Sequence, residues 1–368
     1  MSDLATSEMV LNMGPQHPST HGVLRIIVTL DGEMIVRAIP DIGFLHRGIE
    51  KISETWRFHQ IPIMADRADY LSAFNTEFAL MLAAERLWGV QVPERAEYVR
   101  VILAELNRIA SHLMFYGSFG ADAGFSTPFT YAFRLREVIQ DVFEEVSGAR
   151  LLHNYLALGG LKYDVPQGFK QMVLGILPEI EAGIDECDRL LTDNEVLQAR
   201  TKGLNPLSTE EAIRQGITGP TLRSTGLKRD LRRLVPYSVY EGMDFEIPIG
   251  STGDVFERYL MRLLEMRQSV RIVRHALAQT PDEGSHRGEI PRVLRLPQGE
   301  AYARTESPRG DLCIFLVGTG EAVAHRVKIR APAFTHAGAL EALLPGCYVA
   351  DCVLIIGSMD IVLGEIGR

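Results

Sequence analysis

The sequence predicts an α+β protein with a central bundle of long helices and short β elements at its N- and C-terminal ends. Apolar residues recur with helical spacing through the middle of the chain, whereas alternating, strand-like runs occur only before and after it. We expect a β-rich segment over residues 1–64, a helical bundle over 65–280 and an α+β segment over 281–368. These three segments are expected to pack as one compact unit.

The N-terminal segment contains a β-hairpin signal over residues 22–42. Apolar and polar residues alternate from Val23 to Leu30, and Asp31 with Gly32 forms a strong turn signal between the two runs. The sequence therefore predicts two antiparallel strands joined at this turn.

Long helices are expected to follow this hairpin. Apolar residues at i, i+3, i+4 and i+7 run from Val99 to Leu113 after Pro93, a residue that favours helix starts. The same spacing runs from Leu135 to Val146, and Gly148 suits the position after a helix end. Further helices are expected over residues 65–88, 168–191 and 254–278, with a short helix capped by Ser208 and Glu211.

Strands are expected to return near the C-terminus, over residues 312–317, 322–330 and 353–356. Gly318 and Gly320 could begin a dinucleotide-binding loop. The third glycine of that motif is missing and a strand-like run follows, so a hairpin turn is the favoured interpretation.

Composition excludes several classes of protein. The 368 residues carry a net charge of −9, which argues against nucleic acid as a partner because phosphate binding needs a cationic surface. The basic cluster over residues 228–233 is interpreted as a solvated face or a docking surface for an acidic partner. No run is long and apolar enough to cross a membrane, and the N-terminus lacks the features of a signal peptide. We expect a location in the cytoplasm or on the cytoplasmic face of a membrane complex.

The cysteines do not predict a metal centre. The chain has four cysteines, and no two of them form a C-x-x-C pair. This pattern excludes a zinc ribbon and a self-contained iron–sulfur motif, so we expect the chain to bind no metal and no cofactor by itself. We interpret all four cysteines as small buried residues in a reducing compartment.

Four polar segments stand apart from the helical patterns: GPQHPSTHG at 14–22, GFLHRGIEK at 43–51, DRADYLSAFNTE at 66–77 and GADAGFSTPF at 120–129. Each has an ordinary structural interpretation when taken alone. The first could be a surface loop, Tyr70 at a helix start could be a packing residue, and Asp122 could stabilise a loop between two helices.

Together, the order and spacing of these segments resemble the D subunits of bacterial respiratory NADH:quinone oxidoreductase (complex I), which are related to nickel–iron hydrogenase large subunits. The resemblance covers nearly the whole chain. It continues through residues 191–194 (LTDN), 200–203 (RTKG), 218–223 (TGPTLR), 248–254 (PIGSTGD), 328–332 (KIRAP) and 356–365 (IGSMDIVLGE). One departure is Gly367, which stands where the family commonly has aspartate.

The resemblance implies a hydrogenase large-subunit-like fold and a place in the peripheral arm, on the cytoplasmic face of the cell membrane. There the chain would form one wall of the quinone cavity, beside the subunit with the terminal iron–sulfur cluster and near the membrane-arm subunits. FMN and the clusters would belong to partner subunits. His21 and Tyr70 match the residues that bind the quinone headgroup, Asp122 matches the carboxylate that pairs with that histidine, and Arg47 matches an arginine near the cluster and cavity.

These residue types suit quinone reduction, which takes up two electrons and two protons. Two hydrogen-bond donors are needed because charge develops on two carbonyl oxygens at opposite edges of one ring. Histidine titrates near neutrality and can supply a proton, tyrosine is a donor that resists proton loss, and a carboxylate can orient the histidine. The predicted function is therefore quinone reduction with electrons from NADH, coupled to proton translocation.

Two alternatives compete with this function. A nickel–iron hydrogenase is excluded because its metals are held by two C-x-x-C pairs that this sequence lacks. The other alternative is a non-catalytic structural subunit of a related hydrogenase-like or ferredoxin-linked membrane complex. The presence of both His21 and Tyr70 argues against it.

Overall fold

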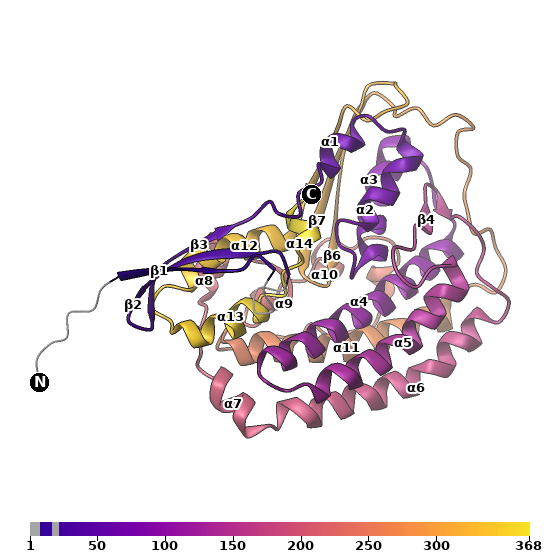
Figure 1. Ribbon diagram of the computed structural model, residues 1–368. Coiled ribbons are helices and arrows are strands. Elements are labelled where there is room, and N and C mark those ends of the chain that lie inside the picture. Colours follow the sequence, from indigo (N-terminus) through magenta and orange to yellow (C-terminus); the bar gives the residue numbers. More distant parts are fainter. Residues whose placement is uncertain (1–7, 17–21) are drawn as a thin grey trace, which may run out of the picture.

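The computed structural model describes residues 8–16 and 22–368, and it confirms an α+β fold with a central bundle (Figure 1). The bundle consists of α4 (Glu94–Asp122), α5 (Thr127–Ser147), α6 (Phe169–Cys187) and α11 (Val255–Gln279). Helix α4 packs against α5, α11 and α3 (Ala73–Trp88), and it is buried on nearly every side. A helix in that position forms the centre of the core.

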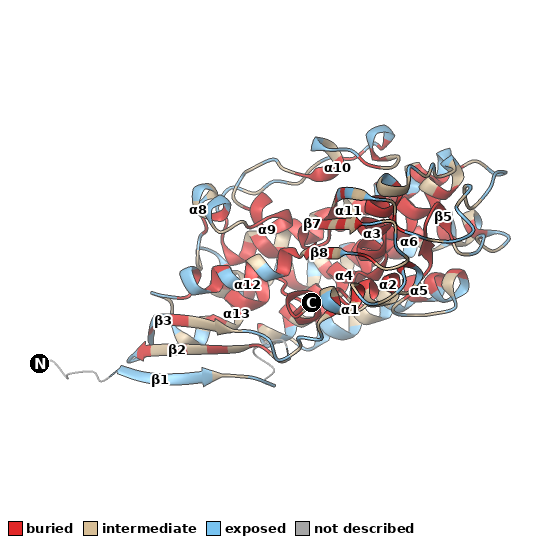
Figure 2. Cartoon of the chain, turned by 90° about the horizontal axis from the view of Figure 1, so that it is seen from above, coloured by how far each residue is buried: buried red, intermediate tan, exposed pale blue. Residues whose placement is uncertain are grey.

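The N-terminal hairpin is confirmed and carries a third strand. Strands β2 (Arg25–Asp31) and β3 (Met34–Asp41) pair antiparallel, and β1 (Glu8–Met13) adds to the free edge of β2. The three-stranded sheet projects from the body of the protein, with β1 exposed at its edge (Figure 2). Only one face of β2 is buried, as its alternating pattern predicts.

A second antiparallel sheet lies near the C-terminus and packs against α3. Its strands are β6 (Gly299–Ser307), β7 (Gly310–Gly318) and β8 (Arg326–Arg330), in that order. Gly318 and Gly320 precede β8 rather than a helix, which confirms the turn interpretation. A two-stranded ribbon, β4 (Leu156–Ala157) with β5 (Gly160–Leu161), also contacts α3 and α4.

Shorter helices connect these parts. They are α1 (Ile49–Ser53), α2 (Ile61–Asp66), α7 (Glu195–Thr201), α8 (Thr209–Arg214), α9 (Gly219–Arg223), α10 (Leu231–Leu234), α12 (Pro332–Leu343), α13 (Cys352–Ser358) and α14 (Leu363–Ile366). Single turns lie at Phe58–Gln60, Asp188–Thr192, Tyr240–Gly242 and Val349–Asp351.

Two predicted elements are wrong. Residues 353–356 belong to the buried helix α13, because a short apolar run is equally compatible with a buried strand and a buried helix. Residues 65–88 are not one helix: α2 ends at Asp66 and α3 begins at Ala73. The turn between them contains Tyr70.

The basic cluster at 228–233 is divided between surface and core: Lys228 is exposed, and Arg229 and Arg233 are partly buried. Arg232 is fully buried and forms ion pairs with Asp230 (2.7 Å), Glu265 (2.8 Å) and Glu105 (3.1 Å). Arg233 lies over the ring of Phe245. Buried charges persist when they are paired in this way, so Arg232 belongs to the core while Lys228 stays at the surface.

The N-terminal cap of α11 offers a simple test of the fold. Asp254 accepts hydrogen bonds from the backbone N–H groups of Glu257 and Gly203, both at 2.8 Å. We expect Asp254→Ala to lower the free energy of unfolding by about 1–2 kcal/mol, and Ser208→Ala, at the exposed start of α8, by about 0.5–1 kcal/mol. Thermal unfolding of the purified chain measures both, and equal losses would show that the bond to Gly203 adds nothing.

Candidate functional site

A cavity of about 370 Å³ lies between the end of α4, the turn before α3 and the C-terminal segment after α13. Apolar side chains form most of its wall, and polar groups are few. The lining residues are Gly22, Tyr70, Leu71, Met114, Phe115, Ser118, Ala121, Asp122, Phe129, Gly357, Asp360, Ile361 and Val362. The structure thus brings together two of the predicted residues, Tyr70 and Asp122, from segments far apart in the sequence.

Tyr70 lies in the turn between α2 and α3 and is partly buried. Burial raises the pKa of its phenol, and the neighbouring Asp69 carboxylate raises it further, while Arg309 and Arg47 oppose this rise. The hydroxyl group therefore keeps its proton at neutral pH and can act as a hydrogen-bond donor.

Asp122 is the last residue of α4, not part of a loop as predicted. Gly117 and Gly120 lie within this helix, and the absence of their side chains lets α5 approach closely. A Cβ atom at Gly117 would lie 3.2 Å from the Cα of Phe129, and one at Gly120 would lie 3.1 Å from the Cβ of Pro128. Gly120, which the sequence placed in a loop, is therefore a packing position between two helices, as is Gly117.

His21 lies outside the described residues, so its position stays a prediction. Gly22, the next residue in the chain, lines the cavity together with Tyr70 and Asp122. Gly22 has φ +113°, a conformation that favours glycine.

Arg47 is exposed and does not line the cavity. Its guanidinium donates a hydrogen bond to the Arg67 carbonyl, at the start of the turn that contains Tyr70. Its backbone N–H donates to the carbonyl of Gly367 at 3.1 Å, which fastens the C-terminus to this segment. A Cβ atom at Gly367 would lie 2.6 Å from the Leu45 carbonyl oxygen, so the close approach requires glycine.

Asp360 is a polar residue of the cavity to which the sequence assigned no role. It is buried, with φ +52°, and its carboxylate faces Arg262 at 3.4 Å and Arg309 at 4.0 Å. Burial by itself would raise the pKa of Asp360, but Arg309 and Arg262 together hold it below its usual range. In the sequence, Asp360 stood out only by its place in the C-terminal motif. Its ion pairs could not be predicted because Arg262 and Arg309 lie far away along the chain.

Buried charges continue behind the cavity wall. Arg309 pairs with Asp69 at 2.7 Å and donates to Ser111 at 2.9 Å. Further into the core, His112 lies 2.8 Å from Glu265. Burial alone would raise the pKa of Glu265, but Arg223, His112 and Arg232 hold it well below its usual range. The cavity is therefore backed by a buried network of paired charged and polar groups.

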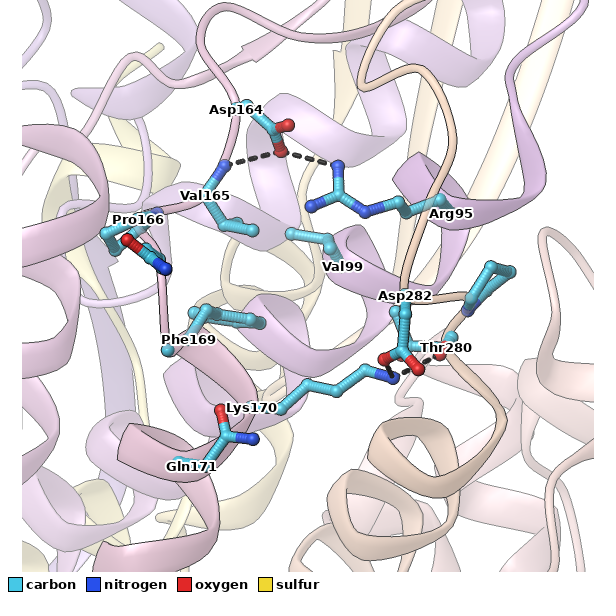
Figure 3. Close-up of a pocket in the computed structure, with 13 residues that line it drawn as sticks. Arg95, Val99, Asp164, Val165, Pro166, Phe169, Lys170, Gln171, Thr280 and Asp282 are labelled. Carbon is cyan, nitrogen blue, oxygen red and sulfur yellow. Dashed lines mark hydrogen bonds and ion pairs between the residues drawn. The ribbon is translucent and has the colours of Figure 1, made fainter.

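A second cavity, of about 380 Å³, lies at the other end of the bundle (Figure 3). It contains none of the predicted residues among those described. Arg95 is paired with Asp164 and Lys170 with Asp282, each at 2.5 Å, as the dashed lines show. Its cations are thus already neutralised by carboxylates, and this cavity is a poorer candidate for the site.

Comparisons with known proteins agree with the resemblance. The family described as "Respiratory-chain NADH dehydrogenase, 49 Kd subunit" matches residues 122–295 and 289–368. The chain belongs to this family.

Relatives that carry the name of the D subunit of NADH-quinone oxidoreductase match along nearly the entire length. The protein of Desulforamulus reducens is 48% identical, that of Geobacillus kaustophilus 46% and that of Bacillus anthracis 44%, each over 99% of both chains. A likeness that covers both chains end to end places the cavity, the turn with Tyr70 and the C-terminal segment inside the shared region.

The described part of the chain contains no cluster of metal ligands. Among residues 8–16 and 22–368, no three or more His, Cys, Asp or Glu side chains form a group that could hold a metal ion. Within the same residues, no helix has both the length and the apolar character needed to span a membrane. The four cysteines are free thiols, and Cys347 alone among them is only partly buried.

Proposed function

We propose that the chain forms one wall of the quinone-reducing site of an NADH:quinone oxidoreductase. The observation that carries this proposal is that Tyr70 and Asp122 share a cavity with otherwise mainly apolar walls. A quinone headgroup is a flat apolar ring with two carbonyl oxygens, and it needs apolar walls with a few well-placed polar groups.

In the proposed reaction, the quinone takes up two electrons and two protons to become a quinol. Tyr70 donates a hydrogen bond to one carbonyl oxygen and His21 to the other, while Asp122 orients His21 and stabilises its protonated form. The paired network of Asp69, Arg309 and Asp360 holds the cavity wall in place. The electrons originate from NADH and pass through FMN and iron–sulfur clusters of partner subunits, since this chain has no C-x-x-C pair.

The proposal includes a place in the complex. The chain lies in the peripheral arm on the cytoplasmic face of the cell membrane, next to the subunit with the terminal cluster and close to membrane-arm subunits. Quinone reduction there is coupled to proton translocation. The family membership and the full-length relatives support this assignment.

Tyr70→Phe tests the proposal most directly. We expect the assembled complex to lose about 5- to 150-fold in kcat/KM for quinone, because one unpaired buried acceptor costs about 1–3 kcal/mol. Electron transfer from NADH to a soluble acceptor upstream of the quinone should persist. Tyr163→Phe, at an exposed tyrosine, is the matched control and should have no effect. Wild-type quinone kinetics in Tyr70→Phe would reduce Tyr70 to a packing residue.

A further inference from the structure

Two buried carboxyl groups face each other behind the turn that contains Tyr70. Asp66 is the last residue of α2, and Glu77 lies one turn into α3. Both residues are fully buried, each has one carboxyl oxygen without a hydrogen-bond partner, and they lie close enough for the Glu77 carboxylate to raise the pKa of Asp66. An ionised carboxylate can only accept hydrogen bonds, so these two oxygens can satisfy each other only if one of the two groups carries a proton.

The other contacts of the pair show which atoms hold that proton. One oxygen of Asp66 accepts the Asn154 N–H at 2.7 Å, and one oxygen of Glu77 accepts the N–H groups of Tyr155 (2.9 Å) and Leu156 (2.6 Å). Asp66 Oδ1 and Glu77 Oε1 accept no hydrogen bond from any N–H or O–H group elsewhere in the described chain. These two oxygens are therefore left for a proton between them.

The surrounding charges fit one negative charge on the pair and not two. Arg67 acts on Asp66, while Lys162 and Arg100 act on Glu77 from neighbouring segments. Arg100 is already paired with Glu85 at 2.6 Å. Burial and the nearby Glu77 carboxylate raise the pKa of Asp66 to about 11, so the proton is retained at neutral pH.

We propose that Asp66 and Glu77 share one proton and that this pair positions the turn that presents Tyr70 to the cavity. The pair links the end of α2 to the start of α3, so the segment between them, which contains Tyr70, is held at both ends. It also fastens the backbone of residues 154–156 to the same place. Without the proton, two carboxylates would repel each other in the core and separate the two helices.

Kinetics of the assembled complex test the positioning role, which rests on the proposed function of Tyr70. Asp66→Asn and Glu77→Gln each keep an N–H donor between the two groups, and we expect quinone KM and kcat within about threefold of wild type. Asp66→Ala removes the donor, and we expect quinone KM to rise by about tenfold or more through misplacement of Tyr70. NADH oxidation with an upstream soluble acceptor should be unchanged in all three variants. Glu179→Gln, at an exposed position on α6, is the matched control.

Hydrogen exchange in the same complexes tests the shared proton without reference to quinone. Peptides covering residues 67–77 and 151–158 should exchange at wild-type rates in the two amide variants and faster in Asp66→Ala. If Asp66→Ala prevents assembly, the two amide variants carry the test alone, because retention of a single donor should preserve both readouts.

Two results would overturn the proposal. Loss of exchange protection in Asp66→Asn and Glu77→Gln would show that both groups must be ionised, and wild-type kinetics and exchange in Asp66→Ala would show that the pair positions nothing. Failure of the proposed function has a different signature. Tyr70→Phe would then leave quinone kinetics unchanged, while the exchange measurements would still decide whether the proton is shared.

Discussion

Replacement of Arg309 by methionine is expected to lower the free energy of unfolding by about 3–5 kcal/mol, since a buried charge is left without its partner. Arg309 is fully buried, pairs with Asp69 at 2.7 Å and lies 4.0 Å from Asp360. Methionine fills much of the same volume but supplies no positive charge. Two carboxylates beside the cavity would then face each other without compensation.

The loss of unfolding free energy in Arg309→Met should be smaller at acidic pH than at neutral pH. Without the guanidinium, the carboxyl groups of Asp69 and Asp360 ionise less readily in the folded state than in the unfolded chain, so their folded-state pKa values rise. A carboxyl group whose pKa is higher in the folded state than in the unfolded chain lowers the stability of the folded state when it ionises, and it has no such effect while it is protonated. The loss of stability should therefore shrink as the pH falls from about 7 towards the ordinary pKa of aspartate, near 4.

Denaturant unfolding of the purified chain at several pH values measures both effects. Arg274→Met is the matched control, because Arg274 is half exposed and its ion pair with Glu181 (2.9 Å) should contribute less than about 1 kcal/mol. Adding Asp69→Asn to Arg309→Met should recover part of the lost stability. If the loss of unfolding free energy in Arg309→Met did not change with pH, the electrostatic explanation would be contradicted and only a packing defect would remain.

The helical bundle could be predicted from the sequence because local patterns determine it. The apolar spacing from Val99 to Leu113 identified one face of α4, and the caps at Asp254 and Gly148 mark the ends of their helices. The sequence did not reveal that the other face of α4 is buried as well. Arg100, Glu105, Arg108 and His112 have charged or polar partners in the core, and most of these lie far away along the chain.

The same limit explains why the surface interpretation of residues 228–233 is wrong for Arg232. A basic cluster is typical of a protein surface, and only the tertiary contacts with Glu105 and Glu265 show that Arg232 belongs to the core. The end of α4 shows a different limit. Glycine often marks the end of a helix, but Gly120 lies inside α4, where the absence of a side chain lets α5 pass close by.

The candidate site came from the resemblance and not from local patterns. Tyr70 and Asp122 were matched residue by residue, and the structure places both at one cavity. Asp360 and the Asp66–Glu77 pair were not assigned, because a single carboxylate in a sequence carries no sign of its burial or of its partner. Both depend on contacts between segments that only the fold brings together.

His21 and Asp122 are expected to act as one unit in quinone reduction. In the proposed site, Asp122 at the end of α4 orients His21, whose neighbour Gly22 lines the same cavity. His21→Ala and Asp122→Asn should each lower kcat/KM for quinone by about 10²-fold or more, the usual contribution of a positioned proton donor. The double variant should be hardly worse than the worse single variant, because both changes disable the same donor.

The control cycle combines Asp122→Asn with His325→Ala, at an exposed histidine between β7 and β8. Those two changes should have additive effects, since the residues belong to separate parts of the fold. All variants are compared as assembled complexes whose clusters are reduced by NADH at the wild-type rate. If the losses of His21→Ala and Asp122→Asn add in full, the two residues act independently, and Asp122 serves only to stabilise the end of α4.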